Sequence, residues 1–284
     1  LSIRRQRQMC IRDSYYFARM VPGYRIPVLE QLNQRLGGHL IVCSGQPQGA
    51  SSLAYLVSKG SHSYEHVVLR NFWMSGDKIH AQPFRSVFRS FGPPSVVLAE
   101  ESPRSLTLPL LLRHARRQGA GRVLWGHFSS LKRPYNPAKH PFDRYRLHLA
   151  RSVEACACYT SGVADILRPY IPDEKLFVAR NTIDLEPLFV LRQELEKDGR
   201  KDVRRRLGIA GDSHVLVYLG RLIPEKGTKM LLESFKSFSA GADAVLIVIG
   251  DGPDRQFMEA YVSNHDLRGV RILGPLSDEM AAPY

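Results

Sequence analysis

The sequence has no long apolar run. One of the longest, SLTLPLLL (105–112), holds only eight residues and includes a serine, a threonine and a proline. A helix that crosses a bilayer needs roughly 18 or more predominantly apolar residues. The sequence therefore predicts no membrane-spanning segment.

Cysteine is scarce as well: Cys10, Cys43, Cys156 and Cys158 are the four cysteines among 284 residues. So few in a chain of this length do not suggest a disulfide framework. Cys156 and Cys158 are spaced like half of a zinc site, but no second pair of Cys or His stands at a suitable distance. They alternate within EACACYTS, as residues on one face of a strand do. We expect buried thiols in a reducing cytoplasm.

Several motifs that would indicate a particular reaction or ligand are missing. The sequence contains no phosphate loop of the form G-x-x-x-x-G-K-[ST] and no H-E-x-x-H zinc motif. GDGPD (250–254) holds two glycines but is not the G-x-G-x-x-G fingerprint of a dinucleotide-binding domain. Function has to be sought in less general patterns.

Negative charge is in short supply. The chain has 27 Asp and Glu against 40 Lys and Arg, which gives a net charge of +13 and a pI near 9.8. From Arg104 to Arg151, eleven Lys and Arg accompany one acid, Asp143. Such a block is typical of surfaces that meet nucleic acid, an anionic membrane or an acidic small molecule, and a solvated face would look the same. Aromatic residues are not interleaved with the basic ones as a stacking platform requires, so we expect no nucleic-acid partner.

What the chain does have, from residue 25 onward, is an alternation of short apolar runs with segments of helix length. The runs that suit strands buried on both faces are HLIVC (39–43), HVVL (66–69), SVVLA (95–99), RVLWG (122–126), ACACY (155–159) and KLFVA (175–179). Alternation of this kind predicts an α/β fold with parallel sheets and right-handed crossovers.

We expect four parts along the chain. Residues 1–14 contain four arginines and show neither the helical nor the strand periodicity of apolar residues. We expect them to be a non-native or disordered arm. Residues 15–190 form the first domain and the densely charged residues 191–208 a surface connection. Residues 209–284 hold three strands, HVLVYLG, AVLIVIG and VRILG, in a βαβαβ pattern. Three strands are too few for a complete doubly wound domain, so the second domain is expected to be truncated.

Two cations mark the turn after the first of these three strands, in YLGRLIPEKGTKMLLESF (218–235). Ligands of open α/β sheets bind beyond the carboxyl ends of the strands, where helix N-termini present free N–H groups. Arg221 and Lys226 would there face an anion, most simply a diphosphate. The alternative pairs Arg221 with Glu225 and leaves Lys226 in water. In GDGPD, Asp251 and Asp254 are expected to cap a helix rather than bind a metal.

Four segments, in order, resemble glycosyltransferase family 4: ARNTIDLEPLF, YLGRLIPEKGTKMLLESF, VIGDGPDRQ and VRILGPLSDEMAAPY. The resemblance is specific over roughly residues 178–284. Over residues 15–177 it is looser and rests on VPGYRIPVLEQL and VLWGH. It implies the GT-B fold, in which two Rossmann-like domains face a cleft, with the acceptor on the first domain and a nucleotide-sugar donor on the second.

The resemblance also implies roles for single residues. Arg221 and Lys226 match the cations that hold the donor diphosphate and stabilise charge on the leaving group. His127 matches the cleft histidine near the sugar. The other donor-side positions are Gly220, Gly250, Asp251, Gly252, Pro253, Leu273, Gly274 and Pro275. The flexible acceptor-side loop corresponds to Gly23, Tyr24 and Arg25. No metal and no further cofactor is implied.

This chain departs from the family pattern at two places. The family commonly has PNGID where this chain has RNTID, so Arg180 and Thr182 replace a proline and a glycine beside Asn181. Asn181 and Asp184 match the signature that leads out of the first domain. The family's pair of glutamates, which bind the donor sugar and ribose, would follow residue 284.

The sequence thus predicts a cytoplasmic glycosyltransferase that acts with retention on a lipid-linked or saccharide acceptor of the cell envelope. The fragment itself is expected to be inactive. Contact with the inner face of an anionic membrane would account for the basic block. Two alternatives stay open: a catalytically incomplete nucleotide-sugar binder and a basic nucleic-acid-binding protein.

Overall fold

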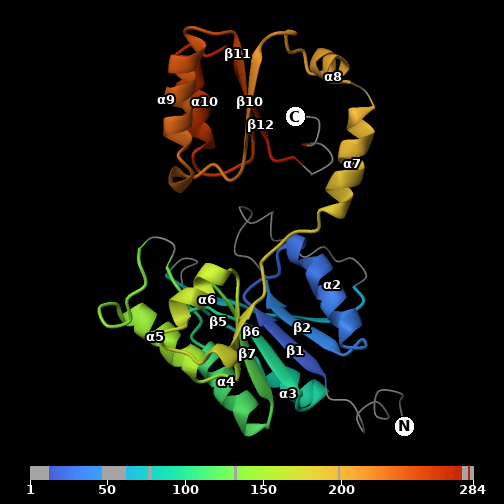
Figure 1. Ribbon diagram of the computed structural model, residues 1–284, viewed down its shortest axis with the longest axis vertical. Coiled ribbons are helices and arrows are strands. Elements are labelled where there is room, and N and C mark those ends of the chain that lie inside the picture. Colours follow the sequence, from blue (N-terminus) through green and yellow to red (C-terminus); the bar gives the residue numbers. More distant parts are fainter. Residues whose placement is uncertain are drawn as a thin grey trace. The chain divides into compact units, whose positions relative to one another are not determined.

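The computed structural model describes residues 13–46, 62–75, 79–130, 133–197, 199–276 and 281. The chain divides into two compact units, unit 1 (Leu1–Ile183) and unit 2 (Asp184–Tyr284). Each unit is a parallel sheet packed against helices (Figure 1). No helix in the described part of the chain is long and apolar enough to cross a bilayer.

Unit 1 is built on a seven-stranded sheet in the order β3-β2-β1-β6-β7-β8-β9, with every neighbouring pair parallel. Its strands are β1 (Ser14–Ala18), β2 (Leu40–Gly45), β3 (Glu65–Leu69), β6 (Val96–Glu100), β7 (Gly121–Gly126), β8 (Ala155–Cys158) and β9 (Leu176–Val178). The six predicted strands are therefore confirmed as β2, β3 and β6 to β9.

Strand β1 lies at the centre of this sheet and was not predicted. Its alternate side chains enter two separate cores, Tyr15 and Phe17 on one face and Tyr16 and Ala18 on the other. The backbone carbonyl of Asp13 accepts a hydrogen bond from the Ser95 amide at 2.9 Å. Unit 1 therefore includes residues 13 and 14, and the predicted boundary at residue 15 is wrong. Residues 1–12 of the predicted arm lie outside the described residues.

Helices cover both faces of the sheet. They are α2 (Ile26–Arg35), α3 (Arg85–Phe91), α4 (Leu108–Arg117), α5 (Pro141–Arg151) and α6 (Ser161–Leu167), with the short 3-10 turns η2 (Gly23–Arg25) and η4 (Asp173–Lys175). Helices α3 to α6 pack in the larger core, and α2 is the one described helix of unit 1 that packs on the opposite face, through Leu29. A small antiparallel hairpin, β4 (Phe72–Met74) and β5 (Ile79–Ala81), stands apart from the main sheet.

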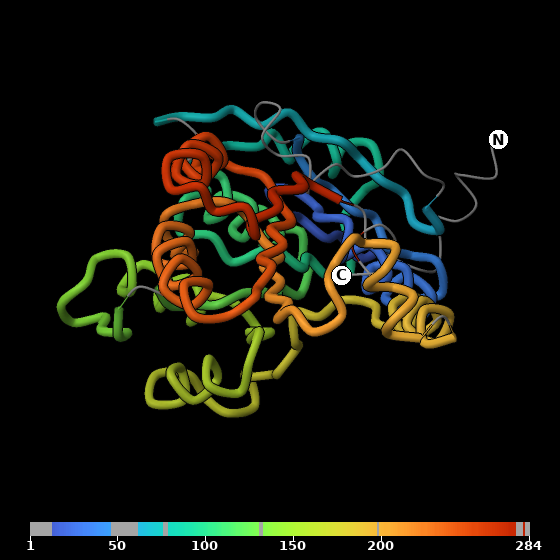
Figure 2. Tube along the Cα trace, turned by 90° about the horizontal axis from the view of Figure 1, so that it is seen from above, coloured from blue at the N-terminus to red at the C-terminus, as the bar shows by residue number. Residues whose placement is uncertain are grey.

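Unit 2 has a parallel sheet of three strands in the order β10 (His214–Leu219), β11 (Ala244–Ile249) and β12 (Val270–Gly274). Helices α9 (Thr228–Ser239) and α10 (Arg255–Asn264) lie side by side and cover one face of it (Figures 1 and 2). Strands β10 and β11 lead into α9 and α10 through tight turns, the first of which contains the 3-10 turn η5 (Pro224–Lys226).

Residues 191–208, predicted to be a connection, are largely helical. They fall in α7 (Glu186–Glu196) and α8 (Arg200–Arg206), both within unit 2. The units divide after Ile183, earlier than the predicted end of the first domain at residue 190. The charge of α8 had suggested a linker, but Leu207 and Ile209 beyond it pack on the sheet.

The thiols are buried as predicted: Cys43, Cys156 and Cys158 are free and inaccessible. Burial raises the pKa of Cys156 to about 12 and that of Cys158 to about 11, so both stay protonated at neutral pH. Cys10 lies outside the described residues.

The core of unit 1 can be tested through Leu124, which is 0% exposed in β7, against Leu110, which is 58% exposed on α4. Leu124→Ala should lower the free energy of unfolding by about 2–5 kcal/mol, because it opens a cavity. Leu110→Ala should change it by less than about 0.5 kcal/mol. Both tryptophans of the chain, Trp73 and Trp125, lie in unit 1, so tryptophan fluorescence during urea unfolding reports on this unit. Equal effects of the two substitutions would contradict the described packing.

Candidate functional site

The sheet of unit 1 reverses its strand order beside β1. The chain runs outward from β1 through β2 to β3 and then returns to place β6 on the other side of β1. At such a switch point the loops after the two strands diverge and leave room for a ligand at the carboxyl edge of the sheet. The loop after β1 carries Gly23–Arg25, and the turn after β7, next to β6, carries His127. The topology thus brings the predicted acceptor-side loop and His127 to the same edge.

Arg25, predicted as part of a flexible acceptor-side loop, is enclosed within the unit. Its side chain is 3% exposed, while Gly23 and Tyr24 remain exposed in the same 3-10 turn. The guanidinium donates to the hydroxyl groups of Tyr16 and Tyr159, each at 2.8 Å. It also lies over the ring of Trp125, 4.5 Å from the ring centroid. Arg25 is therefore placed to hold the loop in position rather than to reach out to a ligand.

The same cluster fixes the segment that leaves unit 1. Arg25 donates to the side-chain carbonyl of Asn181 at 3.0 Å, and the indole N–H of Trp125 donates to the backbone carbonyl of Ala179 at 2.9 Å. Burial raises the pKa values of Tyr16 and Tyr159, so both phenols stay neutral and Arg25 carries the charge of the cluster. Asn181, assigned to the family signature, thus has a structural partner more than 150 residues away in the sequence.

His127 follows β7 directly and is half-buried at the carboxyl edge. Its ring meets the ring of Tyr159 edge to face, with centroids 4.7 Å apart. Burial lowers the pKa of His127, and the positive charge of Arg146 lowers it further. The imidazole is therefore neutral at pH 7 and can accept or donate a hydrogen bond at this edge.

Glu101 supports the turn that carries His127, a role that sequence reasoning missed. It is 8% exposed, accepts from the Phe128 amide at 3.2 Å and pairs with Arg146 at 3.1 Å. Phe128 has a φ of 51°, in the left-handed region. A Cβ on Gly126 would lie 2.6 Å from the Cβ of Glu101, so only glycine lets the carboxylate approach. The paired acids that end SVVLAEE were the only sequence signal.

In unit 2 the three strands each end in or just before a glycine, at Gly220, Gly250 and Gly274. The Gly220 amide donates to Ile249 at 3.0 Å, and the Gly250 amide donates to Gly274 at 2.8 Å. Gly250 has a φ of 144°, and a Cβ there would lie 1.9 Å from the carbonyl oxygen of Gly220. Only glycine permits this contact, so the strand ends form a close-packed backbone edge.

The turns beyond this edge are tied to each other. The Leu222 amide donates to the Asp251 carbonyl at 3.0 Å, and the buried hydroxyl of Thr228 donates to the Asp254 carboxylate. A Cβ on Gly252 would lie 2.2 Å from the Leu222 carbonyl oxygen. Asp254 is the N-cap residue of α10, but its side chain makes no capping hydrogen bond. The expected capping role is thus replaced by a link between the two turns, and Thr228 is a second residue that sequence reasoning missed.

Arg221 and Lys226 lie in the turn between β10 and α9, and both are exposed. Gly227, in the left-handed conformation, is the N-cap of α9, and no side chain caps this helix. Its first N–H groups and the two cations therefore make this end of unit 2 suitable for an anion.

The remaining donor-side positions divide by burial. Pro253 and Pro275 are exposed, and Asp251 accepts from the Gly252 amide at 2.9 Å. The half-buried side chain of Leu273 packs against the core on the other face of the sheet. Among the described residues, no group of three or more His, Cys, Asp or Glu is placed to hold a metal ion.

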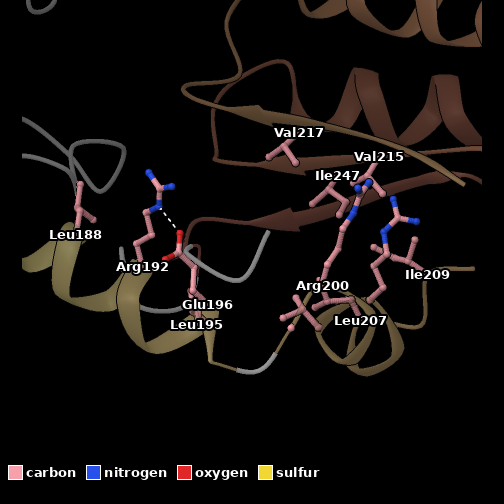
Figure 3. A pocket seen from close by; sticks show the side chains of 13 residues that line it. Leu188, Arg192, Leu195, Glu196, Arg200, Leu207, Ile209, Val215, Val217 and Ile247 are labelled. Carbon is pink, nitrogen blue, oxygen red and sulfur yellow. Dashed lines mark hydrogen bonds and ion pairs between the residues drawn. The ribbon is translucent and has the colours of Figure 1, made fainter. Parts of the chain in front are cut away.

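A cavity of about 680 Å³ lies elsewhere in unit 2, on the sheet face opposite α9 and α10 (Figure 3). Leu188 and Leu195 of α7 line one side of it, and Val215, Val217 and Ile247 of the sheet line the other. Arg192 and Glu196 form an ion pair of 2.8 Å at its border. None of the predicted site residues lines this cavity.

Residues 199–282 match the family described as Glycosyl transferases group 1. The chain is 33% identical over 87 residues to the putative teichuronic acid biosynthesis glycosyltransferase TuaC of Bacillus subtilis, covering 28% of this chain and 22% of that protein. It is 27% identical over 125 residues to the alpha-monoglucosyldiacylglycerol synthase of Streptococcus pneumoniae, covering 43% of this chain and 28% of that protein. The chain thus matches less than a third of the length of either relative.

Solved structures match nearly the whole chain. Anabaena Alr3699/HepE, in a complex with UDP and glucose, superposes with a TM-score of 0.63 at 15% identity, covering 96% of this chain and 72% of that one. Sucrose-phosphate synthase of Thermosynechococcus elongatus superposes with a TM-score of 0.58 at 16% identity, covering 96% and 73%. These likenesses confirm the predicted fold class, an α/β chain with two Rossmann-like units of the GT-B kind.

Arg25 should be required for the stability of unit 1. Arg25→Met removes charge-assisted hydrogen bonds to the buried Tyr16 and Tyr159 and to the exposed Asn181, and it should lower the free energy of unfolding by on the order of 3 kcal/mol. Arg25→Lys should recover little of this, because an ammonium cannot reproduce the planar fork over Trp125. The control is Arg35→Met on α2, where the same substitution falls at an exposed position. Tryptophan fluorescence in urea measures the free energy of unfolding of each variant. Equal stability of the two Met variants would refute the stabilising role of the Arg25 hydrogen bonds.

Arg146 should set the protonation of His127. Arg146→Gln removes the nearby positive charge and should raise the pKa of the His127 imidazole, because burial alone then opposes protonation. The pKa of His127 is lower in the folded state than in the unfolded state, so on acidification the unfolded state binds the proton first. Unit 1 therefore loses stability as the pH falls below about 6.5. That loss should be smaller in the variant. NMR titration of the imidazole protons measures the pKa directly.

Arg144→Gln, at an exposed position of the same helix, is the matched control and should leave the pKa of His127 unchanged. A pKa of His127 that does not rise on Arg146→Gln would show that the charge of Arg146 does not act on the imidazole.

Proposed function

We propose that this chain is part of a glycosyltransferase of family 4 that transfers a sugar from a nucleotide-diphosphate donor. The carboxyl edge of the unit 2 sheet carries this proposal. There Arg221 and Lys226 lie exposed beside the uncapped end of α9, within the segment that matches the glycosyltransferase family. The complex of the similar Anabaena protein with UDP supports a nucleotide diphosphate as the ligand.

The chemistry follows from where charge develops in the reaction. As the bond between the sugar carbon and the diphosphate of the donor breaks, negative charge grows on the departing diphosphate and positive charge grows on the sugar carbon. Fixed cations and helix N–H groups stabilise the diphosphate without reorganising, which is electrostatic preorganisation. Arg221 and Lys226 would supply the cations, and Gly220, Gly250 and Gly252 would let the backbone come close to the donor. We propose transfer with retention and without an obligatory metal ion, and we name no nucleophile.

Unit 1 is proposed to hold the acceptor. His127 is neutral at its carboxyl edge, and the exposed Gly23 and Tyr24 border the same edge. The names of the relatives refer to teichuronic acid biosynthesis and to a glucosyldiacylglycerol. We therefore propose a saccharide or lipid-linked acceptor of the cell envelope and a cytoplasmic enzyme that works at the membrane.

In the enzyme of which this chain is proposed to be a part, Arg221→Ala and Lys226→Ala should each lower kcat/KM for transfer by a factor of on the order of 100 to 1000, about 2.7–4 kcal/mol of transition-state stabilisation. The unfolding temperature should hardly change, because both side chains are exposed. Lys229→Ala is the matched control. Lys229 is an exposed cation on the first turn of α9 and pairs with Glu233 at 3.8 Å.

Titration calorimetry with UDP separates this function from that of a binding protein. UDP binding that weakens in the Arg221 and Lys226 variants, together with transfer by the unsubstituted protein, supports the proposal. UDP binding by that whole protein, without transfer for any donor and acceptor tested, would indicate a nucleotide-sugar binder. Variants with unchanged turnover would remove Arg221 and Lys226 from the site.

A further inference from the structure

The β4–β5 hairpin continues into a third extended segment, residues 104–106. The His80 amide donates to the Arg104 carbonyl at 3.1 Å, and the Leu106 amide donates to the His80 carbonyl at 3.0 Å. Side chains alternate between the two faces of such a ribbon. His80 and Ser105, which are 2% and 8% exposed, point inward. Their neighbours in sequence therefore point away from unit 1.

The outward face of this ribbon is apolar. Phe72, Met74 and Leu106 are 48%, 41% and 53% exposed, and Phe72 and Met74 come from the same face of β4. Leu110, at 58% exposure, lies four residues after Leu106 in the first turn of α4. Single exposed leucines are ordinary, but large apolar side chains gathered on one ribbon and the helix that follows it mark an interaction surface.

Exposed arginines occur in the same segment, residues 104–106, and in helices α3 and α4. Helices α3 and α4 pack against each other through Phe88 and His114, whose ring centroids are 4.6 Å apart. Arg85 of α3 and Arg117 of α4 both help to lower the pKa of His114, after burial, so both lie near this contact. We call the whole surface the cationic apolar face, and it consists of Phe72, Met74, Leu106, Leu110, Arg85, Arg89, Arg104, Arg113 and Arg117. The described residues of β4, β5, α3, α4 and 102–107 include no Asp or Glu.

The structure divides the basic block seen in the sequence. Beyond α4, Arg122 pairs with Glu154 at 2.5 Å, Arg133 pairs with Asp143 at 2.5 Å, and Arg146 pairs with Glu101 at 3.1 Å. These cations neutralise acids within unit 1. The arginines of α4 and of the segment before it are exposed, and the described residues of these two segments include no acid, so these arginines can meet an external anion.

We propose that the cationic apolar face docks on the surface of an anionic lipid bilayer. Its arginines would pair with lipid phosphates, while Phe72, Met74, Leu106 and Leu110 would enter the boundary between headgroups and acyl chains. A second copy of the chain fits poorly, because the same face would bring arginines against arginines. The proposal rests on the proposed function in one respect, the lipid-linked acceptor, which docking would bring close to unit 1. The segment 102–107 leaves the carboxyl end of β6, beside Glu101.

Sedimentation with vesicles tests the docking. The protein should bind vesicles of phosphatidylcholine mixed with phosphatidylglycerol and should not bind vesicles of phosphatidylcholine alone. The double variant Arg113→Gln/Arg117→Gln should lower the partition coefficient by on the order of tenfold or more, since each cation near the surface contributes about a factor of five. Leu106→Ser/Leu110→Ser should lower it to a similar degree, because the apolar contact is lost.

The matched control is Arg200→Gln/Lys201→Gln, which removes two exposed cations from α8 of unit 2 and should leave vesicle binding unchanged. Circular dichroism, which reports on the helices and strands of both units, shows that each variant is folded. The proposal is overturned if vesicle binding does not depend on lipid charge. It is also overturned if the arginine substitutions lower the partition coefficient and the leucine substitutions do not. A gel shift of single-stranded RNA that is lost in the same arginine variants, without vesicle binding, would replace the membrane by nucleic acid and also overturn it.

UDP titration on the same samples keeps this proposal separate from the proposed function. UDP binding without vesicle binding contradicts the docking proposal and leaves the proposed function intact. Vesicle binding without UDP binding supports the docking and counts against the transferase.

Discussion

Parallel pairing on both sides of β1 is the constraint on which the arrangement of unit 1 depends. Because β2 and β6 both run parallel to β1, the loops after these strands leave the sheet at one edge, and the turn after β7 joins them there. The reversal of strand order at β1 separates these loops enough for side chains to gather between them. Arg25, His127 and Glu101 therefore lie at one edge although more than 100 residues separate the first from His127.

The two units build their edges by different physical means. In unit 1, buried charged groups hold the turns: Arg25 binds two tyrosines and Asn181, and Glu101 binds the Phe128 amide and Arg146. In unit 2, the backbone itself forms the edge, since glycines let neighbouring turns touch directly. This leaves the charged side chains of unit 2, Arg221 and Lys226, exposed and available to a ligand. In unit 1, the buried charged side chains hold the loops of the edge in position. In unit 2, the backbone contacts leave the cations of the edge free to meet an anion.

Net charge is an ambiguous guide to partners until its pairing is known. The excess of positive charge is compatible with a solvated face, a membrane or a nucleic acid. In the folded chain, Arg122, Arg133 and Arg146 neutralise acids inside unit 1, whereas the described residues of α4 and of the segment before it include exposed arginines and no acid. Position, rather than number, separates the cations that stabilise the fold from those that can meet a partner.

The alternation of strands and helices, the buried cysteines and the placement of two cations after a strand could be predicted from the sequence, because each depends on neighbours along the chain. Strand β1 was missed because SYYFA directly follows an arginine-rich stretch without periodicity. The burial of Arg25 could not be predicted, since Tyr159 and Asn181 lie 134 and 156 residues away from it. The sequence by itself determined which elements form and which charges follow them. Only the tertiary structure decided which charges are buried in pairs and which stay exposed, because that depends on contacts between segments far apart in the chain.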